Sequence, residues 1–321
     1  MERQTLGNKY AIPISIVLAG MMITAGTYSS KTVSSGENSA ASNKTAATQD
    51  IQASVTEEAV SPSGGVILPV VWGDLGARLV NSGTIDAGKF KAIYESGGRF
   101  DDEYQELLFG QNDGRLKITK ENAGYILNLF WALGLANSNA ILDSGEMTNS
   151  TYGGAQNFAS TGGWTVAKGS PMNHYSQHVF FNLTSGQQAL VEKVSKNIYR
   201  PCCNNPTYFP DCNHGMAMLG FLELMASQGV SEQDMYKAAL VVNSYWFPDT
   251  YIIIAKYMKM KDIDWNDVRP IEILSANYSS GSGFAKISAQ VSQPVQKEGD
   301  RCGVDTQQPI AQPKQQSGCG V

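Results

Sequence analysis

Residues 119–134 read TKENAGYILNLFWALG, and this stretch decides the fold class. Thr119 is placed to cap a helix. The residues that follow recur at helical spacing on one stripe, made of Ala123, Ile126, Leu127, Phe130, Trp131 and Gly134. A stripe this broad predicts a central core helix.

Shorter amphipathic patterns lie on both sides of this helix. We expect further helices near residues 74–80, 86–94, 101–110, 184–198, 215–229, 231–246 and 249–258. Thr184 and Gln187 have the spacing of a capping box, and Pro201 and Pro248 are expected to end helices. The expected N-terminal caps of these helices are Asp74, Asp86, Asp101, Thr184, Ser231 and Asp249. Because strand-like alternation is scarce, the sequence predicts an all-α fold with a single compact helical domain over residues 65–290.

Composition changes at both ends of that domain. Arg3 and Lys9 precede an apolar run, so residues 1–27 are expected to be an uncleaved membrane anchor or a signal peptide. Residues 28–64 are rich in Ser, Thr and Ala, and residues 291–321 in Gln, Pro and Gly; we expect a disordered linker and a disordered tail. The tail carries Cys302 and Cys319. The expected location is outside the cytoplasm, attached to the membrane or secreted after signal cleavage.

Charge and motifs give no support to several classes of function. The chain has 321 residues and a formal net charge of -5, which gives no general electrostatic reason to expect nucleic-acid binding. It contains no Cys-x-x-Cys, no His-Glu-x-x-His, no Gly-x-Ser-x-Gly, no phosphate-binding loop and no dinucleotide fingerprint. Whether the protein is an enzyme is therefore left open.

Every histidine lies near three of the five cysteines in the sequence. Mixed sulfur and imidazole ligands suit zinc and copper. Histidines four residues apart share one face of a helical turn, and the cysteine loop returns after the helix that Thr184 caps. If both groups converge, the sequence predicts a centre for a soft or borderline ion, used in sensing, buffering or delivery. The candidate ligands are His174, His178, Cys202, Cys203, Cys212 and His214.

The three cysteines are not equivalent. Cys202 and Cys203 are neighbours, and in an extended backbone they point to opposite faces, so one can ligate while the other pairs or packs. Asp211 or Asn213 is placed to cap the following helix, and amides at a helix N-terminus lower the pKa of a thiol. We therefore expect Cys212 to be the most activated thiol.

Two other functions fit the same residues. The first is a thiol-disulfide oxidoreductase that cycles Cys202, Cys203 and Cys212, with His214 tuning the thiolate. The second is a structural module, in which a disulfide to Cys212 staples a proline-rich loop.

Overall fold

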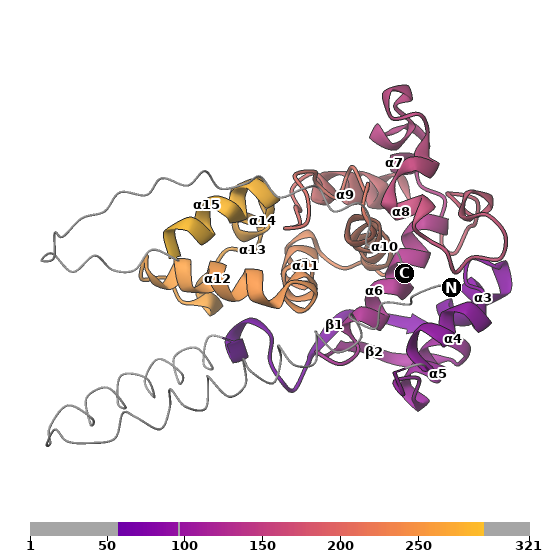
Figure 1. Ribbon diagram of the computed structural model, residues 1–321, viewed down its shortest axis with the longest axis horizontal. Helices are drawn as coiled ribbons and strands as arrows, with labels where there is room; N and C mark the ends of the chain where they lie inside the picture. Colours follow the sequence, from indigo (N-terminus) through magenta and orange to yellow (C-terminus); the bar gives the residue numbers. More distant parts are fainter. Residues whose placement is uncertain (1–56, 96, 292–321) are drawn as a thin grey trace, which may run out of the picture. The chain divides into compact units, whose positions relative to one another are not determined.

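The computed structural model describes residues 57–95 and 97–291 (Figure 1). The expected anchor at 1–27, most of the expected linker, and the tail with Cys302 and Cys319 lie outside the described residues. None of the helices in the described part is long and apolar enough to cross a bilayer.

The described chain begins before the expected domain boundary. Residues 57–64, which we expected in the linker, include the buried Val60 and Ser61. The Tyr245 hydroxyl also donates a hydrogen bond of 2.6 Å to the carbonyl oxygen of Pro62. This segment is therefore packed against the domain.

The prediction of a mostly helical domain with a compact core is confirmed. The α-helices are α3 Leu75–Ser82, α4 Ala87–Glu95, α5 Asp102–Phe109, α6 Ala123–Ala136, α7 Ala140–Ser144, α8 Ala159–Gly162, α9 Ser185–Ser195, α10 Asn213–Ser227, α11 Glu232–Trp246, α12 Pro248–Lys259, α13 Pro270–Ile273, α14 Ala276–Ser279 and α15 Gly281–Val291. Short 3-10 segments occupy Glu146–Thr148, Ser150–Tyr152, Ala155–Asn157, Pro171–Asn173 and Trp265–Asp267.

Several of the expected caps are present. Thr184 and Gln187 form the capping box of α9, and Asp101 and Ser231 accept from Tyr104 N and Asp234 N. The expected cap of α12 is wrong, because Phe247 holds the N-cap position and Asp249 lies inside the helix, after Pro248.

A small two-stranded sheet, which the sequence did not predict, accompanies the helices. Strand β1, Val66–Gly73, pairs antiparallel with β2, Asn112–Ile118. Leu68, Val70 and Trp72 are buried on one face of β1. The alternation is invisible in the sequence because the positions between them, such as Ile67 and Val71, are also apolar.

Helices α6 and α10 cross at the centre of the core (Figure 1). Nearly every residue of both is buried, which confirms α6 as the central helix. The Phe130 and Phe221 rings stack with centroids 4.7 Å apart. The backbones meet at Gly134 and Gly220, where a side chain on either residue would collide with the other helix.

Glu223 of α10 is fully buried beside the C-terminal end of α6. Asn139 Nδ2 donates to Glu223 Oε1 at 2.6 Å and Asn137 Nδ2 donates to Oε2 at 3.1 Å. The oxygen of Asn137 accepts from Phe180 N, so this amide is fixed as a donor toward Glu223. Burial raises the pKa of Glu223 well above its usual value, and the two amide hydrogen bonds only partly oppose that increase.

The raised pKa of Glu223 predicts a pH dependence of stability. A carboxyl group whose pKa is higher in the folded chain holds its proton more tightly there. Its contribution to the free energy of unfolding is therefore complete at low pH and is lost as pH rises toward the folded pKa. Glu223→Gln removes the titration. We expect the unfolding free energy of the wild type to fall relative to this variant by up to about 1.4 kcal/mol per pH unit above about pH 5. Urea unfolding of both proteins across this range measures the difference, and a constant difference would contradict the prediction.

Candidate metal centre

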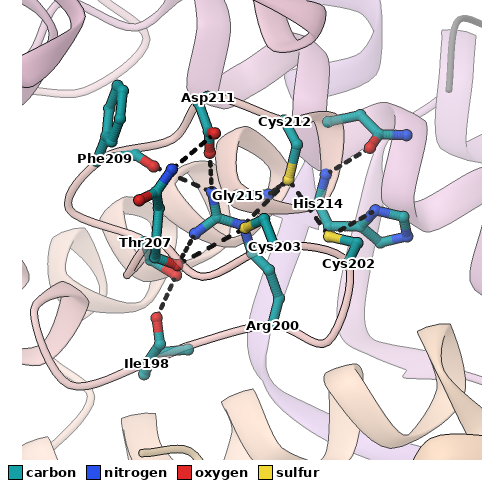
Figure 2. A network of polar contacts seen from close by, with 12 residues as sticks. Ile198, Arg200, Cys202, Cys203, Thr207, Phe209, Asp211, Cys212, His214 and Gly215 are labelled. Carbon is teal, nitrogen blue, oxygen red and sulfur yellow. Dashed lines mark hydrogen bonds and ion pairs between the residues drawn. The ribbon is translucent and has the colours of Figure 1, made fainter. Parts of the chain in front are cut away.

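The three described cysteines are brought together by the loop between α9 and α10. Helix α9 ends at Ser195, well before Pro201, so the proline is not what stops it. The chain then folds back on itself, because Thr207 N donates to Ile198 O at 2.8 Å. This return brings the turn that carries Cys202 and Cys203 to the start of α10, where Cys212 lies (Figure 2).

The loop is also fixed by a helix that lies later in the chain. Gly281 N donates to the carbonyl oxygen of Cys203 at 2.8 Å, and Ser282 N donates to Asn204 Oδ1 at 2.8 Å. Both donors lie in the first turn of α15. The cysteine turn is therefore held between α10 and α15.

The three sulfur atoms lie close enough to bind one metal ion. Cys202 Sγ is 3.5 Å from Cys212 Sγ, and the sulfur atoms of Cys202, Cys203 and Cys212 all lie within 4.8 Å of one another. A tetrahedral zinc ion with bonds of about 2.3 Å would separate its sulfur ligands by about 3.8 Å. All three are free thiols, and Cys202 is the exposed one.

We call the sulfur atoms of Cys202, Cys203 and Cys212 the sulfur cluster, and His214 lies beside it. Its Nδ1 atom is 4.0 Å from Cys202 Sγ. The ring packs against Phe247 with centroids 4.4 Å apart and against Trp246 at 5.9 Å. These aromatic contacts hold the imidazole on the Cys202 side of the cluster, where it can supply a fourth ligand.

Cys212 itself is the N-cap of α10, which corrects the expectation that Asp211 or Asn213 would cap this helix. Its sulfur accepts hydrogen bonds from Gly215 N at 3.4 Å and from Arg200 Nε at 3.0 Å. Charge-assisted donors and amides at a helix N-terminus favour a thiolate.

The surroundings of the three thiols lower the pKa of one of them and raise the pKa of the other two. Hydrogen bonds from Cys202 and Cys203, with further help from Arg200 and His214, hold the pKa of Cys212 well below its usual value despite its burial. The same contacts with Cys203 and Cys212, together with burial, raise the pKa of Cys202. For Cys203, the contact with Cys202 lowers the pKa, but the contact with Cys212 and burial outweigh it and raise the value to about 11. Cys212 is thus the most activated thiol, as expected.

Arg200 organises the loop, although no motif in the sequence singled it out. Its side chain is 1% exposed, and its guanidinium donates to Asp211 Oδ1, to the carbonyl oxygens of Asn205 and Phe209, and to Cys212 Sγ (Figure 2). A weak signal was present, since Arg200 directly precedes the Pro-Cys-Cys motif and Asp211 directly precedes Cys212. These two opposite charges close the loop at its ends.

The other two histidines form a separate pair. His174 Nε2 lies 3.0 Å from the carbonyl oxygen of Lys168, and His174 Nδ1 lies 3.0 Å from His178 Nε2. Because a carbonyl oxygen only accepts, His174 carries its proton on Nε2 and accepts from His178 at Nδ1. Burial, followed by repulsion from His174 when that ring is protonated, lowers the pKa of His178.

The structure thus brings together three of the six expected ligands, Cys202, Cys203 and Cys212, and places His214 beside Cys202. The backbone of His178 lies at the end of α6, where it donates to Ala136 O. Within the described part of the chain, the side-chain contacts of the histidine pair include no cysteine and not His214. The group of converging ligand atoms found among the described residues consists of Cys202, Cys203 and Cys212.

Comparison with known proteins gives no relative from which to infer a function: no family model, no curated protein and no solved structure matches the chain. The function must therefore be argued from the chemistry of the site.

Proposed function

We propose that this domain binds one soft or borderline metal ion through Cys202, Cys203 and Cys212, with His214 as the fourth ligand. The convergence of three sulfur atoms within 4.8 Å carries the proposal. Three thiolates and one imidazole are a common ligand set for zinc and also suit copper.

Charge balance favours a dication. Arg200 is positive and Asp211 is its partner, so the two nearly cancel. Three thiolates with a zinc ion then leave one net negative charge, whereas a copper(I) ion leaves two. Because isolated charge is costly to bury, we propose zinc as the preferred ion and copper(I) as the competitor.

Preorganisation supports binding. A metal ligand must be a thiolate, and Arg200 Nε and Gly215 N already stabilise this form of Cys212. The first metal-sulfur bond therefore forms without loss of a proton from Cys212. Cys202 is exposed, so a bound ion would be accessible from the solvent and could be exchanged with it. This accessibility fits sensing, buffering or delivery better than a purely structural ion.

The location of the domain is a separate part of the proposal. It rests on the sequence of residues 1–27 alone, whose basic start and apolar run suit a membrane anchor. We propose that the domain is attached to the membrane through this segment and lies outside the cytoplasm.

Elemental analysis tests the metal site directly. The protein is purified without a metal-affinity tag, reduced, reconstituted with zinc and freed of excess ion by dialysis. We expect one zinc per chain in the wild type, and we expect Cys212→Ser and Cys203→Ser each to weaken binding by at least about 100-fold, since even indirect disturbance of a metal ligand costs about 10-fold to 100-fold.

Histidine variants provide the matched comparison. His214→Gln should weaken zinc binding, whereas His174→Gln should leave it unchanged because His174 is hydrogen-bonded to His178 and Lys168. Circular dichroism of each variant checks that it is folded. Sub-stoichiometric zinc in the folded, fully reduced wild type would end the proposal.

A further inference from the structure

We infer that the sulfur cluster is also a redox switch, in which a hydroperoxide joins Cys212 to Cys202 in a disulfide and thereby releases the bound ion. The disulfide stands on the geometry of the thiols, whereas the release of the ion rests on the proposed function.

The geometry selects the pair. Cys202 Sγ and Cys212 Sγ are 3.5 Å apart, in contact, with no side chain to displace between them. Cys202 is the exposed thiol of this pair, and Cys212 is fixed at the N-cap of α10. A small movement of the Cys202 side chain therefore suffices to bring the two sulfur atoms to bonding distance.

The alternative pairings are less favourable. Cys202 and Cys203 are neighbours in the sequence, so their Cα atoms are about 3.8 Å apart across a trans peptide. This distance is shorter than the roughly 4.4 Å minimum between the Cα atoms of ordinary disulfides. Cys203 Sγ points instead toward the carbonyl oxygen of Asn205, at 3.8 Å, and its backbone is held by Gly281. Cys203 is therefore expected to remain a thiol.

The chemistry divides between the two cysteines. Cys212 has the stabilised thiolate, with Arg200 Nε and Gly215 N on its sulfur, so it is the nucleophile. It attacks one oxygen of the hydroperoxide, the O–O bond breaks, and the other oxygen takes up a proton and leaves as an alcohol, or as water from hydrogen peroxide. Cys212 is left as a sulfenic acid.

Cys202 completes the reaction. Its sulfur attacks the sulfenic sulfur of Cys212, the S–O bond breaks, and the proton of Cys202 leaves with the hydroxyl group as water. The two thiols have lost two electrons and the peroxide has gained them. A disulfide sulfur is no longer a thiolate ligand, so the ion keeps only Cys203 and His214 and dissociates.

Peptide mapping after treatment with hydrogen peroxide tests the disulfide. The full chain, reduced and free of metal, is given one equivalent of hydrogen peroxide, alkylated and digested. We expect a Cys202–Cys212 disulfide with Cys203 alkylated. Cys203→Ser should form the same disulfide, whereas Cys202→Ser should stop at a sulfenic acid on Cys212 that dimedone traps. A disulfide from Cys202 to Cys203, a disulfide to the tail cysteines, or no disulfide in the folded wild type would overturn the inference.

Release of zinc from the loaded protein is measured in parallel with a chromogenic chelator. We expect one zinc released per disulfide, and rebinding after reduction with dithiothreitol. A chain that forms the disulfide but binds no zinc would refute the proposed function and leave the disulfide standing. A chain that binds zinc and keeps it after the Cys202–Cys212 disulfide forms would overturn the switch and leave the proposed function standing.

Discussion

Replacing Gly134 by alanine should destabilise the domain by about 3 kcal/mol, at the upper end of the usual cost of overpacking a core. A Cβ atom on Gly134 would overlap the carbonyl oxygen of Met216 and lie 2.8 Å from Gly220 N. These are backbone atoms and cannot rotate away, so α6 and α10 would have to separate. The separation would also loosen the stack of Phe130 on Phe221.

The same helix supplies the control for this experiment. Gly124 lies in α6, it is exposed, and a Cβ atom added to it would have no neighbouring atom within 4 Å. Gly124→Ala should therefore stabilise the domain by about 0.5–1 kcal/mol, because alanine loses less conformational freedom in a helix. Urea unfolding of the two variants should show changes of opposite sign. A neutral or stabilising Gly134→Ala would mean that α6 and α10 do not meet at this position.

The helices could be located from sequence because their signals are local. The capping box of Thr184 and Gln187 and the apolar stripe of α6 each depend on residues within a few turns. Strand β1 could not, because its outward positions, including the exposed Ile67, are largely apolar like the buried ones. A period of two is visible only when one face is polar.

For the candidate site too, the sequence predicts local proximity and does not predict long-range packing. Cys202, Cys203, Cys212 and His214 share one loop and the helix start that follows it, so their proximity is nearly local. Whether His174 and His178 join them depends on where a distant segment packs, and Asn137 and Ala136 hold that segment at the end of α6. No spacing rule in the sequence contains this information. The N-cap role of Cys212 was missed because thiols are not among the preferred capping side chains.

Arg200→Met should cost about 3–5 kcal/mol of unfolding free energy in the reduced, metal-free protein, the range found when one partner of a buried ion pair is removed. The substitution leaves the Asp211 carboxylate without its cation and the Cys212 thiolate without its Nε donor. It also leaves the carbonyl oxygens of Asn205 and Phe209 without the guanidinium that they accept from. Urea unfolding measures the loss, and Arg115→Met, at an exposed arginine, should change stability by less than about 0.5 kcal/mol.

A double-mutant cycle distinguishes charge compensation from lost packing. If Arg200 mainly neutralises Asp211, then Asp211→Leu combined with Arg200→Met should cost less than the sum of the single variants, because no unpaired carboxylate remains. Additive costs would instead mean that the long side chain of Arg200 acts by filling space. Zinc adds a further comparison. A dication on Cys212 replaces the positive charge that Arg200→Met removes, so bound zinc should restore part of the stability that this variant loses. Zinc should restore no stability in Cys212→Ser.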